Sequence, residues 1–481
     1  MPPLRRLARN FLLVAAAVAA IDAAAVAAQT GEAATGIPVD LVIRGDYVLT
    51  MDANRPLLED GAVVIQGDRI LRVDTWDAVS GRFAAREVLP GEGRIVMPGL
   101  INGHTHSAMT LFRGMVDDLD LMTWLNQYVF PMEGRFVTAD FVRTGSELAC
   151  WEMIEGGTTT FVDMYFYPEV IADVVERCGL RAIVAAPHID YPSPGFEGWD
   201  DSFAAAIEFV QAWQGRHPRI TPAFAPHAPY TVVPEHIAAT ARIAAKLNAP
   251  ISMHVAEAPS ESEFIWERYE TSPVRHVAAT GLFKQRLIAA HMVQLDEQDI
   301  ALVAANGVGA VHNPTSNMKL GAGVSPVSAM IAAGVNVGLG TDGAASNNDL
   351  DMWEEVRLAA LVHKLKSGDP TALPAATALD MATRMGSLAI GMGDTIGRLA
   401  PGMQADLIQV DFTRQRHGPL YDVTSHLVYV LDSQDVMTTV VAGRILMRNR
   451  EVLTLDGAQL RKDVGEVRDA IQAALAGATA E

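Results

Sequence analysis

Short apolar runs alternate with amphipathic stretches through the middle of the chain. Apolar runs bounded by turn residues are typical of buried strands, and apolar residues three and four positions apart are typical of helices packed on a sheet. We predict eight strands, at residues 95–97, 158–163, 181–186, 220–225, 251–254, 287–291, 309–312 and 336–340. Helices are expected to begin at prolines, at Pro168, Pro234 and Pro326. Eight strand–helix units predict an α/β fold of the TIM (β/α)8 barrel type.

An open, doubly wound sheet is the alternative for this alternating pattern. The dinucleotide-binding form of that fold carries Gly-x-Gly-x-x-Gly after its first strand. No such motif follows residues 95–97 here, which weakens the alternative.

Strand patterns without intervening helices occur at both ends of the chain. They lie at residues 40–44, 62–66 and 69–73 near the start, and at residues 405–410 and 436–447 near the end. We predict that they form one small β-sandwich, built from residues 38–94 and 396–455. The barrel then takes residues 95–395, and residues 456–481 form a C-terminal helical tail.

The first thirty residues have the pattern of a secretory signal peptide. A basic start that includes Arg5 and Arg6 is followed by an apolar run over residues 11–20 and an Ala-rich stretch that ends at Ala28. This order of regions predicts cleavage near Ala28 and export to the periplasm, by the Sec or the twin-arginine route. After cleavage we expect no stable membrane association. An uncleaved anchor and a misassigned start codon are the alternatives.

Composition and charge narrow the classes of partner. Of the 481 residues 49% are hydrophobic, which excludes global disorder. The formal net charge of −20 argues against nucleic acid and anionic lipid as partners. We expect a small-molecule substrate, and self-association into a homo-oligomer stays open. Cys150 and Cys178 both lie in apolar helical patterns and are predicted to be buried thiols.

Side chains that can bind metal or move protons gather at the carboxyl ends of the predicted strands. They are His104, His106, His227, His254, Glu257, His291 and Asp342. A parallel barrel places its active site at that rim. His104 and His106 point to the same side of an extended segment, although such a pair alone also fits a solvated turn. Three imidazoles and a carboxylate suit a zinc-like ion that keeps one position for water.

Several motifs together resemble the amidohydrolase superfamily. They are PGLINGHTH at 98–106, EGGTTT at 155–160, HAPYT at 227–231, HVAE at 254–257, Ala290-His291, HNPTSN at 312–317 and GTDGAASN at 340–347. More closely, they resemble the 5′-methylthioadenosine/S-adenosylhomocysteine deaminases of its chlorohydrolase-like branch. The resemblance covers the chain from about residue 38 to residue 455.

The resemblance implies a role for individual residues. The implied metal ligands are His104, His106, His254 and Asp342. Glu257, His291 and Asp342 are the implied catalytic groups, and the implied substrate contacts are Trp124, Glu133 and His227, with Glu133 on the ribose hydroxyls. Simpler structural interpretations stay open for three of them: Trp124 as a core residue, His227 as a packing residue and Glu257 as a support for the ligands.

We expect one divalent ion per chain rather than two. Binuclear relatives bridge their ions with a carbamylated lysine ahead of the third histidine. The first lysine of this chain is Lys246, in a helical pattern, and no strand before His254 carries one. We expect the ion to be zinc, with iron, nickel and manganese as alternatives.

The implied reaction is hydrolytic deamination of an adenine nucleoside such as 5′-methylthioadenosine or adenosine. The metal activates water, Asp342 accepts its proton, and Glu257 protonates a ring nitrogen. No Arg or Lys stands between residues 185 and 215, where relatives hold the carboxylate of S-adenosylhomocysteine. Deamination or dechlorination of a guanine, pterin or triazine is the alternative, and a non-catalytic barrel is a third possibility.

Overall fold

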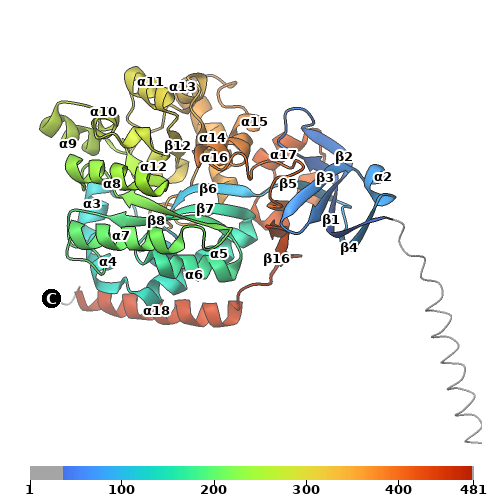
Figure 1. Cartoon of the computed structure of the whole chain (residues 1–481), viewed down its shortest axis with the longest axis horizontal. Helices are drawn as coiled ribbons and strands as arrows, with labels where there is room; N and C mark the ends of the chain where they lie inside the picture. Colours follow the sequence, from blue (N-terminus) through green and yellow to red (C-terminus); the bar gives the residue numbers. More distant parts are fainter. Residues whose placement is uncertain (1–35, 479–481) are drawn as a thin grey trace, which may run out of the picture.

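Eight short parallel strands form the barrel in the computed structural model, which describes residues 36–478. They are β6 (Leu100–Thr105), β7 (Thr158–Met164), β8 (Arg181–His188), β9 (Ile220–Pro226), β10 (Ile251–Val255), β11 (Leu287–His291), β12 (Gly309–His312) and β13 (Val337–Leu339). Each strand pairs with the next along the chain. The ring closes where the Asp342 N–H donates to the carbonyl of His104, at 3.0 Å. The predicted TIM barrel is confirmed (Figure 1).

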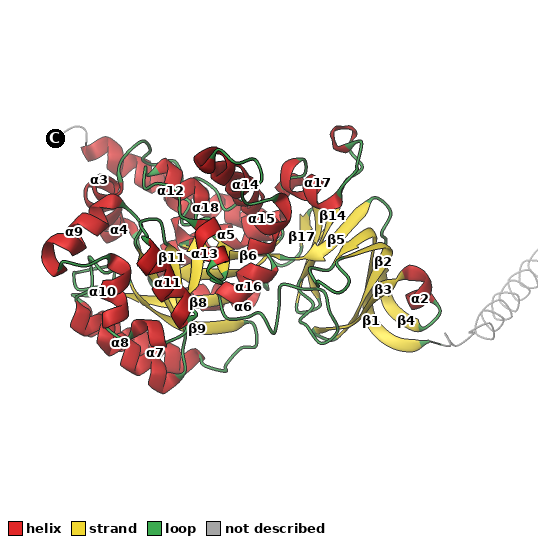
Figure 2. Ribbon diagram, turned by 90° about the horizontal axis from the view of Figure 1, so that it is seen from above, coloured by secondary structure: helices red, strands yellow, loops and turns green. Residues whose placement is uncertain are grey.

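A mixed sheet built from both ends of the chain lies at one end of the barrel (Figure 2). Its strands run in the order β17-β16-β15-β14-β5-β1-β2-β3, with β4 beside β1. Their bounds are β1 (Ile37–Leu49), β2 (Leu57–Gln66), β3 (Arg69–Thr75), β4 (Phe83–Leu89), β5 (Arg94–Pro98), β14 (Leu407–Asp411), β15 (Val436–Val441), β16 (Arg444–Arg448) and β17 (Glu451–Val452). Buried side chains from both ends of the chain, such as Ile43 and Val440, form one core. The contribution of both ends is therefore as predicted.

The prediction that residues 95–97 form the first barrel strand is wrong. These residues belong to β5, which pairs with β1 and β14 in the mixed sheet. Only Gly99 separates β5 from β6, the true first strand of the barrel. A Cβ at Gly99 would come within 2.1 Å of the Thr159 side chain, so the crossing requires glycine. Apart from Arg94, every residue of the two strands is buried, so the sequence pattern does not show where the chain passes from one sheet to the other.

Helices cover the outside of the barrel because each has an apolar face toward the strands. Their bounds are α5 (Ala139–Gly156), α6 (Pro168–Cys178), α7 (Trp199–Trp213), α8 (Pro234–Leu247), α9 (Pro259–Tyr269), α10 (Pro273–Ala279), α11 (Glu297–Asn306), α12 (Pro314–Lys319), α13 (Val327–Ala332), α14 (Met352–Ser367), α15 (Ala375–Met381) and α16 (Arg384–Ala389). The starts of α6 and α8 at proline are as predicted, and α13 begins one residue after Pro326.

Three further helices stand apart from this repeat. Helix α2 (Trp76–Ser80) packs on the mixed sheet, and α17 (Val423–Tyr429) lies between its late strands in the sequence. Helix α18 (Gly457–Ala478) lies along the barrel beside α5 (Figure 2), and its Ile471 joins the main core. Among the helices of residues 36–478, none is long and apolar enough to cross a membrane.

An insertion between β6 and α5 was not predicted. It contains α3 (Leu121–Trp124), a π-helical segment (Leu125–Val129) and α4 (Phe130–Phe136). The insertion lies at the carboxyl end of β6, on the active-site side of the barrel, and it carries Trp124 and Glu133. Single π-helical turns are frequent at functional sites.

The cysteines form a disulfide in this structure. Cys150 of α5 pairs with Cys178 at the end of α6, with a Cα–Cα distance of 6.4 Å. The prediction of two free thiols is therefore wrong. The sequence placed both residues in helices, but it did not show that these two helices pack side by side.

Candidate active site

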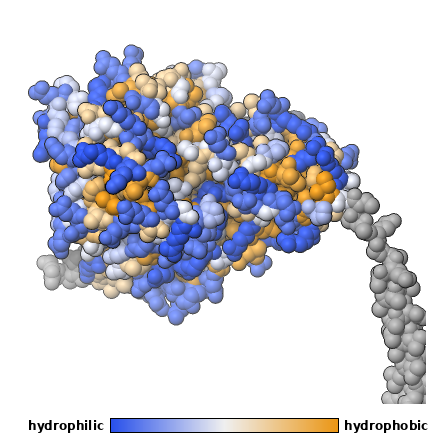
Figure 3. Space-filling model, in the orientation of Figure 1, coloured by the Kyte–Doolittle hydropathy of each residue, from blue (hydrophilic) through white to orange (hydrophobic). Residues whose placement is uncertain are grey.

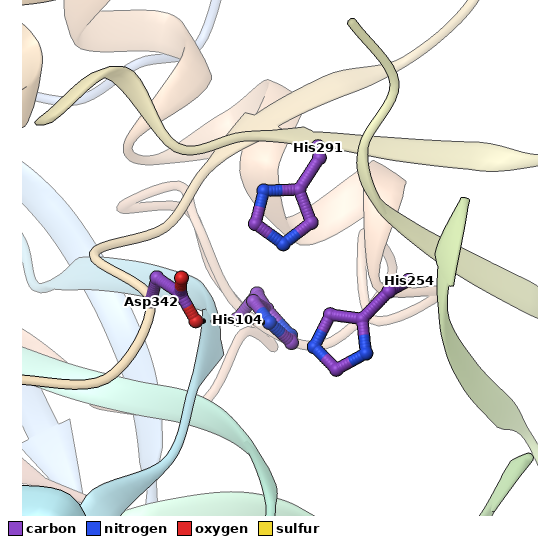
Figure 4. Close-up of side chains that lie close together, drawn as sticks. All are labelled: His104, His254, His291 and Asp342. Carbon is purple, nitrogen blue, oxygen red and sulfur yellow. Dashed lines mark ion pairs between the residues drawn. The ribbon is translucent and has the colours of Figure 1, made fainter. Parts of the chain in front are cut away.

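Five of the predicted residues meet at the carboxyl rim of the barrel. In four of them, His104, His254, His291 and Asp342, one ligand atom each lies within 4.8 Å of the others (Figure 4). His106 joins this group, with its Nε2 3.2 Å from Nε2 of His254 and 3.1 Å from Oδ1 of Asp342. Residues from four strands that are far apart in the sequence thus face one point.

The donor set, and the charge states of His104 and Asp342, fit a divalent metal ion. His104 is fully buried, and neither of its ring nitrogens has a hydrogen-bond partner. Burial lowers the pKa of His104 to about 4, so its imidazole is neutral at pH 7. Burial opposes ionisation of Asp342, but the neighbouring imidazoles of His104 and His106 hold its pKa well below the ordinary value. Neutral imidazole and ionised carboxylate are the forms that bind such an ion.

Neighbouring groups fix the orientation of these side chains. The Nδ1 of His254 lies 2.8 Å from the carbonyl of His227, which leaves Nε2 to face the cluster. The Oδ2 of Asp342 accepts hydrogen bonds from the hydroxyls of Ser316, at 2.7 Å, and Ser346, at 2.8 Å. Its other oxygen is therefore directed at the histidines. Such supporting bonds are what holds metal ligands in place.

Three residues at this rim have a left-handed backbone. The φ angles are +55° at Ala256, +72° at His291 and +64° at Asp342. Non-glycine residues seldom adopt this region, and those that do are concentrated at functional sites. Periodicity in the sequence carries no signal for this conformation.

Glu257 lies in the cavity beside this cluster. Its Oε1 is 3.8 Å from Nε2 of His291. The side chain is buried, and burial raises the pKa of its carboxyl above the ordinary value. The Nδ1 of His291 lies 2.9 Å from Oδ1 of Asn317, so its other nitrogen is free to face the cavity.

Sequence reasoning missed Glu261, whose side chain forms hydrogen bonds with the backbone at Glu257. Its two carboxylate oxygens accept hydrogen bonds from the N–H groups of Ala256, at 2.9 Å, and Glu257, at 2.7 Å. Glu261 is fully buried in the first turn of α9. An acidic residue just after a helix-starting proline was the available signal, but it is common in surface helices too.

The cavity beside the cluster has a volume of about 70 Å³. Trp124, Glu133 and His227, the three predicted substrate contacts, all line it. Burial raises the pKa of Glu133 to about 7 and lowers that of His227 to about 3. Tyr165, which the sequence did not single out, lines the same cavity, and His312 does not.

Comparison with known proteins places these observations in a family. The sequence matches the amidohydrolase family over residues 95–446. It is 46% identical over 418 residues to a 5-methylthioadenosine/S-adenosylhomocysteine deaminase of Pelotomaculum thermopropionicum, covering 87% of this chain and 95% of the relative. It is 44% identical over 418 residues to a 5′-deoxyadenosine deaminase of Methanosarcina mazei, with the same coverage of 87% and 95%.

A solved structure agrees with these relatives. The crystal structure of an adenosine deaminase from Xanthomonas campestris with bound zinc superimposes with a TM-score of 0.89 and 40% sequence identity. The match covers 91% of this chain and 100% of that one.

These relatives correct the prediction of export to the periplasm, which is wrong. The match to the Pelotomaculum thermopropionicum relative, which is named for 5-methylthioadenosine and S-adenosylhomocysteine, covers 95% of that enzyme and 87% of this chain. The basic and Ala-rich residues 1–30, on which the prediction was based, lie outside the described residues. The prediction was based only on the order of basic, apolar and Ala-rich regions, and this order does not determine how a segment is processed.

Proposed function

Since the chain belongs to the amidohydrolase family, we propose that it is a metal-dependent deaminase of an adenine nucleoside, such as 5′-methylthioadenosine or adenosine. The observation that carries the proposal is the buried cluster of histidines and Asp342 beside a second buried acid, Glu257. The relatives named for deamination of 5-methylthioadenosine and 5′-deoxyadenosine support the substrate class.

Four residues are proposed to hold one divalent ion. They are His104, His106, His254 and Asp342. When bound, the ion supplies Lewis-acid activation of water near neutral pH. We expect zinc, because imidazole and carboxylate suit it and because the Xanthomonas campestris structure contains it. Iron, nickel and manganese are the alternatives.

Glu257 is proposed to carry the proton that the ring requires. Water adds to the ring carbon that bears the amino group, and the adjacent ring nitrogen must gain a proton as that bond forms. Burial raises the pKa of the Glu257 carboxyl above its ordinary value, which favours the protonated form that would give its proton to that nitrogen. Asp342 is ionised and accepts a proton from the attacking water. The amino group then gains the proton that Asp342 accepted from water, the carbon–nitrogen bond breaks and ammonia leaves, while the proton of the added hydroxyl returns to Glu257.

The opposite wall of the cavity is proposed to bind the nucleoside. Glu133 would bind the ribose hydroxyls, and in its ionised form both carboxylate oxygens would accept hydrogen bonds from them. Trp124 and His227 would pack against the ring and sugar, since both line the cavity. His227 is neutral because burial lowers its pKa to about 3, so it can offer either a donor or an acceptor.

An ammonia-release screen of the purified, metal-loaded protein tests the proposal. The substrates are adenosine, 5′-methylthioadenosine, guanine, a pterin and a chlorinated triazine. We expect ammonia from the two nucleosides, with kcat/KM at least ~10²-fold above that of any other compound. Turnover of guanine, the pterin or the triazine without turnover of a nucleoside would support the alternative substrate class instead.

A further inference from the structure

A second and larger chamber opens from the active-site cavity on the side away from the histidine cluster. Its volume is about 650 Å³. The two spaces share the lining residues Leu125, Phe130, Glu133, Phe166, Ile189 and Tyr230. None of the clustered histidines, nor Asp342 or Glu257, lines the chamber. Glu133 therefore stands at the junction of the two spaces.

The position of Glu133 between the two spaces determines which part of a bound nucleoside enters the chamber. With the amino group at the histidine cluster and the ribose hydroxyls on Glu133, the remaining substituent position of the sugar is the 5′ carbon. That carbon then points past Glu133 into the chamber. A volume of about 650 Å³ is far larger than a methylthio group requires, so size alone does not restrict the 5′ substituent.

The walls of the chamber are apolar or neutral. They come from the insertion before α5, from the loop after β8 and from α9, which contribute Met122, Tyr191 and Phe264 among others. Tyr191 is 56% exposed and Phe264 is 37% exposed, so the chamber continues to the surface there. Figure 3 shows hydrophobic side chains gathered on the barrel at the end of the molecule away from the mixed sheet.

Positive charge is missing from this wall. Among the described residues that line the chamber there is no Lys, Arg or His, and Glu133 is the one acidic residue. The guanidinium of Arg268 lies nearby, 6.0 Å from the ring centre of Phe264, but its side chain is exposed and does not line the chamber.

We propose that this chamber selects adenine nucleosides whose 5′ substituent is large, uncharged and apolar over those that end in an amino-acid carboxylate. The inference is based on the proposed deaminase function. Apolar surface that leaves water for these walls is stabilised in proportion to its area. A carboxylate in the same place loses water without gaining a cationic partner, which is unfavourable.

A substrate series on the unmodified protein tests this selection. The compounds are adenosine, 5′-methylthioadenosine, 5′-pentylthio-5′-deoxyadenosine and S-adenosylhomocysteine; the last two have substituents of similar length, but only S-adenosylhomocysteine carries a carboxylate and an ammonium group. We expect kcat/KM of the pentylthio compound to equal or exceed that of 5′-methylthioadenosine, and that of S-adenosylhomocysteine to be at least ~10-fold lower than the pentylthio value.

The outcomes separate the two proposals. If S-adenosylhomocysteine matches or exceeds the pentylthio compound, the selection is overturned while the deaminase function stands. If none of the four compounds releases ammonia, the deaminase function fails and the selection fails with it.

A pair of variants provides an independent test. The hydroxyl of Ser193 is buried at the chamber wall without a hydrogen-bond partner. Ser193→Arg should raise the ratio of kcat/KM for S-adenosylhomocysteine to that for the pentylthio compound at least ~10-fold. Ser193→Met adds a similar bulk without charge and should change the ratio less than ~3-fold. Equal ratios in the two variants would contradict the proposal.

A variant of Arg268 tests whether a cationic side chain from outside the chamber wall contacts the substrate. If its guanidinium reached into the chamber, the unmodified protein would accept S-adenosylhomocysteine and Arg268→Gln would lose that activity selectively. We expect instead that Arg268→Gln leaves the ratio within ~2-fold, because the side chain lies outside the chamber. A selective loss would overturn the selection.

Discussion

Two buried carboxyls share one cavity but have different neighbours. Glu257 lies beside His291 and the histidine cluster, whereas Glu133 lies across the cavity near Tyr165. Burial raises the pKa of both. Acids with different surroundings in one site can take different tasks, and we propose that Glu257 gives a proton and Glu133 binds ribose.

Glu257→Gln keeps the shape of the side chain but cannot exchange a proton. We expect metal content to stay near one ion per chain and kcat to fall at least ~10²-fold, the lower end of acid–base contributions. Steady-state kinetics and elemental analysis measure both. Glu263→Gln, an exposed acid on the same helix α9, is the matched control. Retention of most of the kcat in Glu257→Gln, with metal bound, would show that this residue is not the proton carrier.

His254→Ala should remove a metal ligand and leave the other ligands in place. We expect both bound metal and ammonia release to fall below a tenth of the original values, because His254 lies at the centre of the cluster. His276→Ala changes a histidine of α10 outside the cluster and should keep both. Full metal content in His254→Ala would remove this residue from the ligand set.

Glu133 should make stability depend on pH. The pKa of its carboxyl is about 7 in the folded protein and 4.5 in the unfolded chain, so the folded state keeps a proton that the unfolded state releases between these values. Stability therefore falls as pH rises from about 4.5 to about 7. Glu133→Gln is neutral at every pH and should raise the free energy of unfolding at pH 8 by up to ~3 kcal/mol, but only slightly at pH 5.

Urea denaturation at pH 5 and pH 8 measures this difference in the free energy of unfolding. Glu133→Gln should also raise KM for nucleosides, because the variant loses the proposed contact with ribose. Equal stabilisation at pH 5 and pH 8 would mean that the carboxyl does not titrate in this range.

At the scale of elements, helix α9 fixes the loop after β10, which carries Glu257. The loop leaves β10 with a left-handed residue, Ala256, and the carboxyl oxygens of Glu261 accept hydrogen bonds from the N–H groups of Ala256 and Glu257. The hydrogen bonds come from the first turn of α9, so the helix and the loop are fixed to each other.

Glu261→Gln should loosen this turn, because an amide oxygen can accept both N–H groups only with poorer geometry and its NH2 group faces a donor. We expect kcat to fall ~10-fold or more with KM and metal content little changed, since Glu257 moves relative to the substrate. Glu267→Gln, exposed on the same helix, is the control. An unchanged kcat in Glu261→Gln would mean that other contacts already fix the turn.

The helices and strands also show which features of the fold a sequence pattern can predict. The strands that end in His254 and His291 were predicted closely because a short apolar run and a polar end coincide there. The insertion with α3 and α4 was missed even though its buried residues Leu121, Trp124, Leu125 and Val129 have a helical spacing of three and four positions. Ser316 and Ser346 were missed because a serine has no pattern of its own, and only the fold brings both to Asp342.

At the scale of the whole molecule, one buried ion pair joins the barrel to the mixed sheet. Arg181, at the start of β8, lies 2.7 Å from Asp406, just before β14, and it also donates to Gln404. The two charged side chains are 3% and 2% exposed. Breaking such a pair leaves a buried charge without a partner.

Arg181→Met should therefore lower the free energy of unfolding by about 3–5 kcal/mol. Chemical denaturation followed by circular dichroism measures the loss. Arg143→Met removes an exposed ion pair with Asp140 and should cost less than ~1 kcal/mol. Recovery of stability in the double variant Arg181→Met with Asp406→Leu would confirm that the unpaired charge, rather than lost packing, is the cause.

The position of β5 has a consequence for the chain as it leaves the ribosome. Its partner β1 is made early, but its other partner, β14, begins at Leu407, more than 300 residues after β5 ends at Pro98. At roughly 5–20 residues per second, this edge of β5 stays unpaired for about 15–60 s of synthesis. During that interval the early strands present an open, apolar edge, and they depend on the growing barrel or on a chaperone to keep it from pairing with another chain.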